Sequence, residues 1–342
     1  MPVSPQSYTR IVYAQPTKGL IDVKTFRAEE VPFDLKPGAD EVVVRIDYLS
    51  LDPAMRLWIN DGDNEFNYTA PVQVGQTMRG IGLATVIEAG ENSGFSVGDH
   101  VSGTVGVTEY NTVKASTLTK IDLSERSQLL DFIGPLGHPG ITAYIGLFDI
   151  GQIKAGETLV VSGAAGAVGS LVCQLGKDKG AKVYGTVGSA EKCKYLEEDV
   201  GVVKALNYKS PTFREDFVRE FGKIDVFFDN VGGEILDFAL TRLNMHARVV
   251  LCGSISSYTS EAVPFKNFSH VFFHRARVEG FSLIDQGHRF ADARAYLAEK
   301  VAQGALKSKY HILEGIEEVP MAINMLFRGE NNGKLVVKIA HD

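Results

Sequence analysis

Two patterns of hydrophobic and polar residues divide the chain into different kinds of structure. From Tyr8 to about Lys120, short β-rich segments are broken by turns, which predicts a compact, partly open β-barrel. From about Asp122 to Gly304, strands alternate with helical stretches or turns, which predicts an α/β domain with a doubly wound parallel sheet. Strand-like segments then return at 310–314 and 334–339, with a short helix at 319–328 between them. We expect these last elements to rejoin the first domain.

The individual strands follow from the same patterns. Those of the barrel are predicted at 10–13, 41–51, 82–88, 100–107 and 110–114. Those of the parallel sheet are predicted at 159–162, 182–186, 204–207, 224–229, 247–252 and 277–280. The predicted domains are a barrel of residues 1–122, completed by 305–342, and an α/β domain of residues 123–304.

A glycine-rich turn follows the first strand of the predicted parallel sheet, in the sequence TLVVSGAAGAVG at 158–169. Gly163 permits a tight turn, Gly166 lets the backbone approach a phosphate, and Gly169 allows close packing of a helix that we expect at 170–179. This arrangement presents backbone N–H groups to a dinucleotide pyrophosphate. Small residues at such a corner also serve packing alone, which is the alternative interpretation.

The residues after the second strand favour NADPH over NADH. An NAD site has an acidic residue about 20 positions beyond the first glycine, where it accepts hydrogen bonds from a ribose hydroxyl. Gly188 and Ser189 occupy that place here, and Lys192 and Lys194 follow on the next helical turn. The missing carboxylate removes a repulsion, and an ammonium group attracts a 2′-phosphate. The alternative is that Lys192 is a solvated helix lysine, as most lysines are.

Composition and charge exclude several other classes of protein. The chain has 342 residues, of which 44% are hydrophobic and 23% charged, values typical of globular domains. Its net charge of −7 and the lack of a Lys/Arg cluster give no reason to expect a nucleic-acid partner. The N-terminus lacks a secretory pattern and no apolar run has the length of a membrane span, so we expect a cytoplasmic protein with no membrane partner.

The cysteines argue against zinc. Cys173, Cys193 and Cys252 are far apart and fit neither a disulfide framework nor a zinc motif, so we expect reduced thiols. A zinc alcohol dehydrogenase needs a set of Cys and His ligands that these residues cannot supply. We therefore predict hydride chemistry without a metal, on a bond that the substrate's own carbonyl polarises.

Six segments of the chain together resemble one family. They are SLDPAMR at 50–56, GHPGITAY at 137–144, GAAGAVG at 163–169, FDNVGGE at 228–234, CGSISSY at 252–258 and GENNGK at 329–334. In order and spacing they resemble the zinc-free medium-chain dehydrogenase/reductases, in the branch of prostaglandin reductases, plant alkenal double-bond reductases and bacterial curcumin reductases. The resemblance implies a GroES-like barrel, a Rossmann domain, an active site in the cleft between them, and a homodimer.

The resemblance also implies an activity, the NADPH-dependent reduction of the carbon–carbon double bond of an α,β-unsaturated aldehyde or ketone. Hydride would add to the β-carbon, and the resulting enolate would need hydrogen-bond donors at its oxygen. A proton would then reach the α-carbon. Two alternatives remain: a quinone oxidoreductase of the same superfamily, and a non-catalytic relative that binds NADPH, because a fold does not fix a function.

The cofactor contacts implied by the resemblance are carried over residue by residue. The pyrophosphate would be held by Gly166, Ala167, Val168 and Gly169. The 2′-phosphate would be held by Lys192 and Tyr208, with room made by Gly188 and Ser189. The ribose and nicotinamide would be lined by Asn230, Cys252, Gly253, Ser254, Ile255 and Tyr258, joined by Phe281, Leu283 and Asn331, with Thr142 beside the nicotinamide. Each residue also has an ordinary structural role open to it, such as core packing for Cys252 or turn chemistry for the two asparagines.

The chain departs from the family pattern in the predicted substrate pocket. A family tyrosine that precedes the GlyPhe pair at 280–281 corresponds to Phe273, and the tyrosine of the family's AspProTyrMetArg motif corresponds to Ala54. Together with Trp58, these residues predict a pocket with apolar walls and extra room at position 54.

The loss of these hydroxyl groups leaves other candidates for the proton donor. They are Tyr68, Tyr258 and His138, besides a ribose hydroxyl of the cofactor and solvent. A histidine titrates near neutral pH and suits the role. Tyr68 also fits simple packing of a loop, and His138 also fits the capping of a turn.

Overall fold

The computed structural model describes residues 5–59, 69–123 and 127–339. The chain divides into two compact units. The described residues of the first unit fall within 1–133, 310–331 and 335–342, and those of the second within 134–309 and 332–334. We predicted the boundaries after residues 122 and 304. The structure places both boundaries later in the chain, with residues 127–133 in the first unit and residues 305–309 in the second.

The first unit, the barrel unit, is built mainly from strands. Its regular elements are β1 (Ser7–Tyr13), β2 (Phe26–Pro32), β3 (Glu41–Ser50), β4 (Ile81–Ala89), β5 (His100–Thr104), β6 (Tyr110–Lys114), β7 (Leu118–Lys120), β14 (Tyr310–Glu314), α8 (Val319–Arg328) and β15 (Lys334–Lys338). The large sheet has the order β14-β15-β3-β4-β5-β7, and β6 also pairs with β3. β1 and β2 form a separate antiparallel pair.

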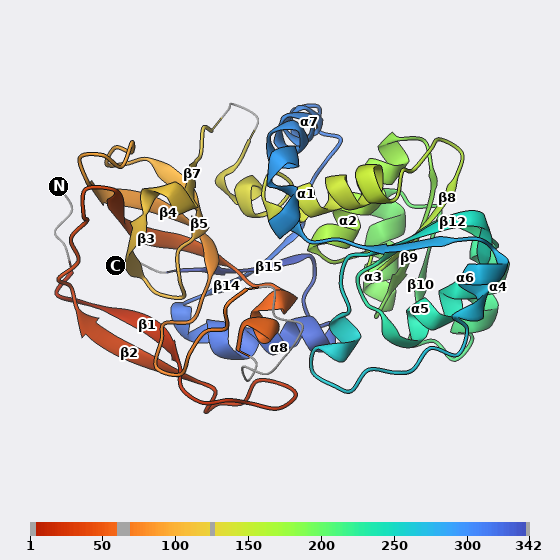
Figure 1. Cartoon of the computed structure of the whole chain (residues 1–342), viewed down its shortest axis with the longest axis horizontal. Helices are drawn as coiled ribbons and strands as arrows, with labels where there is room; N and C mark the ends of the chain where they lie inside the picture. Colours follow the sequence, from red (N-terminus) through yellow and green to blue (C-terminus); the bar gives the residue numbers. More distant parts are fainter. Residues whose placement is uncertain (1–4, 60–68, 124–126, 340–342) are drawn as a thin grey trace. The chain divides into compact units, whose positions relative to one another are not determined.

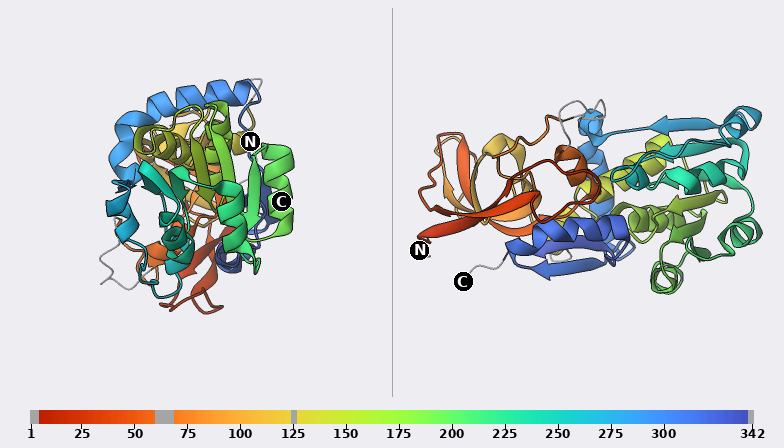
Figure 2. Two further views of the ribbon diagram at one scale, coloured as in Figure 1. Left: turned by 90° about the vertical axis from the view of Figure 1, so that its right-hand side faces the viewer. Right: turned by 90° about the horizontal axis from the view of Figure 1, so that it is seen from below.

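The C-terminal segment completes the barrel sheet, as we predicted from the sequence. β15 pairs antiparallel with β3, with Val336 opposite Ser50 and Val337 opposite Leu49. Figure 2 shows the C-terminal strands and α8 returning beside the N-terminal strands. Strands from opposite ends of the sequence therefore lie next to each other in one sheet.

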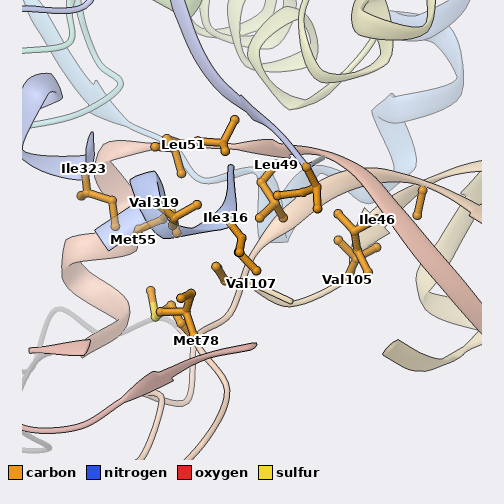
Figure 3. Packing of buried hydrophobic residues seen from close by; sticks show 14 of the residues in the cluster. Ile46, Leu49, Leu51, Met55, Met78, Val105, Val107, Ile316, Val319 and Ile323 are labelled. Carbon is orange, nitrogen blue, oxygen red and sulfur yellow. The ribbon is translucent and has the colours of Figure 1, made fainter. Parts of the chain in front are cut away.

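Buried residues of the strands and of the segments between them form the core of the barrel unit. Ile46 and Leu49 of β3 pack with Met55, Met78 and Val105, all fully or almost fully buried (Figure 3). Ile316, Val319 and Ile323 extend the same cluster from the C-terminal segment. Burial of each such side chain contributes about 1.5–3 kcal/mol to folding.

The second unit, the Rossmann unit, alternates strands with helices. Its elements are α1 (His138–Tyr144), β8 (Thr158–Ser162), α2 (Ala167–Asp178), β9 (Lys182–Val187), α3 (Ala190–Lys194), β10 (Lys204–Asn207), α4 (Phe213–Phe221), β11 (Ile224–Asp229), α5 (Gly233–Leu240), β12 (Leu243–Leu251), α6 (Ser269–Phe273), β13 (Arg277–Gly280) and α7 (Phe290–Ala302). Two π-helical segments, 145–150 and 195–200, continue α1 and α3.

The Rossmann unit contains a six-stranded parallel sheet in the order β10-β9-β8-β11-β12-β13 (Figure 1). Residues 159–162 of β8 are completely buried, as expected for a strand covered on both faces. The chain runs outward from β8 in one direction and from β11 in the other, so the strand order reverses between these two strands. In doubly wound sheets, ligands bind beyond the carboxyl ends of the strands at such a reversal.

The structure corrects several predicted boundaries. The helix after the glycine-rich turn begins at Ala167 and not at Ser170, because Gly166 is its N-cap. The strand predicted to reach Val107 ends at Thr104, because the backbone beyond it bonds to the segment near Gly80 and passes through Gly106 at a φ of +81°. The predicted strand at 247–252 begins earlier, at Leu243, and ends before Cys252.

No helix within the described ranges combines the length and the apolar character that crossing a bilayer requires.

Candidate cofactor-binding and active site

The glycine-rich turn adopts a conformation that other residues would disturb. Gly163 has a φ of +59°, a region that favours glycine. A Cβ atom on Gly169 would lie 2.4 Å from the carbonyl oxygen of Gly163, so this position requires a residue without a side chain. Gly166 is the N-cap of α2, where the structure records no capping bond from a side chain. The first amide groups of α2 thus offer donors that suit an anion such as a pyrophosphate.

A buried carboxylate organises the next loop of the sheet. The carboxylate of Asp229, at the end of β11, is fully buried and accepts hydrogen bonds from the Ser162 hydroxyl (2.6 Å) and from the backbone N–H groups of Val231 (3.2 Å) and Gly232 (2.9 Å). Asn230 joins the same network: its backbone N–H donates to the Ser162 hydroxyl (2.9 Å) and its side chain donates to the Ser162 carbonyl (2.7 Å). These contacts connect the end of β8 to the end of β11.

Burial changes the acid–base properties of two groups in this loop region. Burial raises the pKa of Asp229 to about 6, against the opposing effect of its hydrogen bonds from Ser162, Val231 and Gly232. Burial also raises the pKa of the Cys252 thiol to about 12, with a smaller contribution from the nearby Asp229 carboxylate. Cys252 is therefore a neutral thiol at physiological pH, which suits a packing role better than a nucleophilic one.

The loop after β12 joins the same network through the backbone. The N–H groups of Cys252 (2.9 Å) and Gly253 (3.2 Å) donate to the carbonyl oxygen of Asp229. The hydroxyl oxygen of Tyr258 accepts a hydrogen bond from the backbone N–H of Ser254 (3.2 Å), so Tyr258 folds back onto its own loop. The structure thus brings together the predicted residues Asn230, Cys252, Gly253, Ser254, Ile255 and Tyr258 beside the end of β8.

A second cluster gathers after β9 and β10. A Cβ atom on Gly188 would lie 2.9 Å from the Tyr208 hydroxyl oxygen, so glycine allows the tyrosine to lie over this position. The Ser189 hydroxyl accepts from the backbone N–H of Lys192 (3.3 Å) and caps α3. Burial lowers the pKa of Lys192, and repulsion from the ammonium of Lys209 lowers it further. The predicted 2′-phosphate residues therefore lie together.

Lys209 belongs to this cluster, and we did not predict it. It follows Tyr208 directly, and its ammonium lies 5.9 Å from the centroid of the Tyr208 ring. It comes close to Lys192 because β9 and β10 are neighbours in the sheet. The sequence holds a signal for this residue. Lys209 follows the third strand, which in the family's fold lies beside the second strand.

The other predicted cofactor residues are spread over both units. Thr142 is half-buried on α1, and Leu283 is half-buried at the start of a 3₁₀ turn. Phe281 packs against the segment after α1, where a Cβ atom on Gly146 would lie 2.7 Å from its ring. Asn331 is buried within the barrel unit. The roles of these residues toward a cofactor remain predictions.

The candidates for the proton donor have different surroundings. His138 is the first residue of α1 and is exposed. Tyr258 is half-buried in the loop described above. Tyr68 lies outside the described residues. Their role in proton transfer remains a prediction.

The residues predicted for the substrate pocket lie on two elements. Ala54 and Trp58 belong to a 3₁₀ turn at Pro53–Ile59 in the barrel unit and are half-buried. The guanidinium carbon of Arg79 lies 5.4 Å from the centroid of the Trp58 ring, a cation–π contact that the sequence did not reveal. Phe273 ends α6 in the Rossmann unit and is 64% exposed.

A pocket of about 500 Å³ in the barrel unit is lined by other residues. Arg45, Asp47, Thr85 and His100 contribute polar groups to it, and Tyr48 and Leu129 contribute apolar surface. A register shift in β3 between Ile46 and Tyr48 accompanies it. The lining residues are not among those that we predicted for the site.

Comparison with known proteins agrees with this geometry. Residues 9–121 match the family described as the N-terminal domain of oxidoreductase, and residues 167–299 match the family described as zinc-binding dehydrogenase. The chain is 36% identical to the NADPH-dependent curcumin reductase of Escherichia coli, over 98% of each chain. It is 37% identical to prostaglandin reductase 1 of Bos taurus, over 94% of this chain and 95% of the relative.

A solved structure gives the same result in three dimensions. The structure of CurA from Vibrio vulnificus in complex with NADPH has a TM-score of 0.90 and 33% identity, over 98% of this chain and 100% of that chain. The barrel unit, the Rossmann unit and the glycine-rich turn define the architecture of the medium-chain dehydrogenase/reductases. This chain belongs to the branch of that superfamily that contains the prostaglandin, alkenal and curcumin reductases, which are NADP-dependent double-bond reductases.

The name of the second matched family includes zinc, which raises the question of whether this chain has a metal site. In the part of the chain that the structure describes, no group of three or more His, Cys, Asp or Glu side chains is arranged to hold a metal ion. Cys173, Cys193 and Cys252 are separate, unpaired thiols. Metal-free chemistry remains a prediction.

Proposed function

We propose that this protein is an NADPH-dependent ene-reductase that reduces the carbon–carbon double bond of α,β-unsaturated aldehydes and ketones. The observation that carries the cofactor choice is the cluster of Lys192, Lys209 and Tyr208, in which Tyr208 lies over Gly188, the position where an NAD enzyme has an acidic residue. Two ammonium groups and a phenol provide donors for a 2′-phosphate. The turn at 163–169 provides the amide donors for the pyrophosphate.

The chain's own residues bind and orient the reactants in this proposal. NADPH, when bound, supplies the hydride that adds to the β-carbon of the enone. The loops at 229–233 and 252–258 would line the nicotinamide and its ribose. Tyr258, His138 or Tyr68 would provide hydrogen bonding to the enolate oxygen or the proton for the α-carbon, a contribution that is typically about 10²- to 10⁴-fold in rate.

The names of the relatives support the substrate class. Curcumin, a prostaglandin and 2-alkenals appear in the names of relatives that are 35–37% identical to this chain. Ala54 has a smaller side chain than the tyrosine of the family motif, which favours bulky enones. We therefore propose aryl enones and alkyl enals as the substrate range.

The test is the consumption of NADPH with a panel of 2-alkenals, benzylideneacetone, a curcuminoid and a quinone. Each assay is repeated with NADH, and the products are identified by mass. Saturated ketones or aldehydes formed with NADPH would support the proposal. Turnover of the quinone alone would replace it with the quinone oxidoreductase alternative, and NADPH binding without turnover would favour a non-catalytic role.

A further inference from the structure

The carboxylate of Asp229 has a position that the proposed chemistry does not explain. It is fully buried at the end of β11, and it belongs neither to the glycine-rich turn nor to the phosphate cluster. A buried carboxylate is costly unless hydrogen bonds compensate for the loss of water. Its hydrogen bonds show which parts of the molecule it holds.

Three donors converge on the two oxygens of this carboxylate. Oδ1 accepts from the Ser162 hydroxyl (2.6 Å) and from the N–H of Val231 (3.2 Å), and Oδ2 accepts from the N–H of Gly232 (2.9 Å). An ionised carboxylate accepts at both oxygens, whereas the amide of asparagine places an NH₂ group at one of them. An asparagine at this position would therefore turn its own NH₂ group toward one of the three donors, and two donors cannot form a hydrogen bond.

The donors belong to, or directly adjoin, the loops that carry the predicted cofactor contacts. Ser162 directly precedes Gly163, the first residue of the glycine-rich turn. Val231 and Gly232 belong to the loop that follows Asn230, and Gly232 has a φ of +73°, so this turn is restricted to one conformation that glycine tolerates.

The loop after β12 is attached to the same residue by its backbone. The carbonyl oxygen of Asp229 accepts from the N–H groups of Cys252 and Gly253 at 2.9 and 3.2 Å. Asp229 is thus bonded to the last residue of β8 and to the segments that follow β11 and β12, so its bonds span the reversal in strand order between β8 and β11.

We propose that Asp229 is a positioning residue for the nicotinamide half of NADPH: bonded to Ser162 at the end of β8, it holds the loops after β11 and β12 in the geometry that binds this half. This inference rests on the proposed function, since it assumes that NADPH is the cofactor. The phosphate cluster at Lys192 lies after different strands, so it does not depend on Asp229. Asp229 therefore contributes to the binding of one half of the cofactor only.

The test compares two ligands with the full-length protein, without substrate. NADPH contains both halves of the cofactor, whereas adenosine 2′,5′-bisphosphate lacks the nicotinamide half. We expect Asp229→Asn to raise the Kd for NADPH about tenfold or more, as for a lost charge-assisted hydrogen bond, and to change the Kd for the bisphosphate less than about twofold. Ser162→Ala should show the same selective loss to a smaller degree.

Asp225→Asn is the matched control. Asp225 lies at the other end of the same strand and accepts hydrogen bonds from the Thr158 backbone N–H (2.8 Å) and the Asn244 side chain (2.6 Å). The Asp225→Asn variant should bind NADPH and the bisphosphate as tightly as the wild type does. Circular dichroism and the unfolding temperature establish that each variant is folded, and Ser162→Ala serves in place of Asp229→Asn if the latter does not fold.

The outcomes separate this inference from the proposed function. Folded variants of Asp229 and Ser162 with wild-type affinity for NADPH would overturn the inference, as would an equal loss of affinity for both ligands, which indicates a general structural role. A wild-type protein that binds no NADPH would overturn both. A wild-type protein that binds NADPH without reducing enones would overturn only the proposed reaction, while the selective loss would still support the inference.

Discussion

Lys192 and Lys209 bring two positive charges close to each other in the cluster after β9 and β10. Burial of Lys192 lowers its pKa, and repulsion between the two ammonium groups lowers it further. A doubly charged phosphate between them would relieve the repulsion, because an opposite charge favours the charged form of a lysine. We therefore expect the charged form of Lys192 to be more stable with a 2′-phosphate bound than in the protein without cofactor.

The first prediction concerns this selectivity. Lys192→Ala should raise the Kd for NADPH about 10- to 100-fold, as expected for a charge-assisted contact of about 1.5–3 kcal/mol, and should leave the weak binding of NADH nearly unchanged. Fluorescence titration with both cofactors measures the effect. Lys194→Ala is the control, since Lys194 is 70% exposed and pairs only loosely with Glu198 at 3.8 Å. An equal effect on NADPH and NADH would contradict the assignment.

The second prediction uses the raised pKa of Asp229. Its pKa rises from 3.8 to about 6 on folding because burial disfavours the charged form. Above pH 6 the group is ionised in both the folded and the unfolded chain, and its burial lowers the free energy of unfolding by about 3 kcal/mol. As the pH falls from 6 toward 3.8, the folded chain takes up the proton first and this destabilisation disappears.

Denaturant unfolding of the wild type and of Asp229→Asn across this pH range measures the effect. The variant does not titrate at this position, so the difference between the two proteins isolates the one carboxyl group. The wild type should gain stability relative to the variant, by up to about 3 kcal/mol, as the pH falls from 6 to 3.8. A difference that stays constant with pH would show that the pKa of Asp229 is not raised.

At the scale of elements, the turn between β8 and α2 depends on Gly169. A Cβ atom there would lie 2.4 Å from the Gly163 carbonyl oxygen, a backbone atom that cannot move without distorting the turn. Gly169→Ala should therefore lower the free energy of unfolding by about 1–3 kcal/mol, in the range of overpacked sites, and weaken NADPH binding.

Gly287→Ala provides the matched comparison. A Cβ atom on Gly287 would meet no other described atom within 4 Å, so the same substitution should change the stability by no more than about 0.5 kcal/mol. Thermal unfolding and NADPH titration of both variants decide the matter. Equal stability of the two variants would mean that the turn relaxes at Gly169.

The sequence predicted the elements best where their pattern is local. Residues 204–207, 224–229 and 277–280 form strands with the predicted bounds. β2 was missed because three of its seven residues are charged and only Phe26 is buried, and β7 because it has only three residues. The two π-helical segments were not predicted, because their backbone depends on packing with the rest of the unit.

The candidate site was predicted in part for the same reason. The glycine-rich turn and Lys192 could be identified, since each depends on residues close together in the sequence. The hydrogen bond from Ser162 to Asp229 connects two strands, and the proximity of Lys192 to Lys209 brings together α3 and the turn after β10. They follow from the strand order, which hydrophobic patterns alone do not determine.

At the scale of the whole molecule, β13 is an edge of the parallel sheet. Unpaired edges favour association with another chain, and α6, which precedes β13, exposes 78% of Phe272. We predict a homodimer, with about twice the 37.2 kDa of one chain by light scattering after size-exclusion chromatography. Phe272→Asp should shift the mass toward that of one chain. A wild-type mass of one chain at micromolar concentration would contradict the prediction.

The position of β15 beside β3 also has a consequence for the order in which the protein forms during synthesis. Nearly all residues of the Rossmann unit lie in one continuous stretch, so its sheet can be completed while translation continues. β3 emerges from the ribosome much earlier, yet its neighbour β15 is among the last residues to be made. The newborn chain thus carries an unpaired strand edge almost until its release, and translation that stops before residue 334 leaves the barrel sheet unfinished.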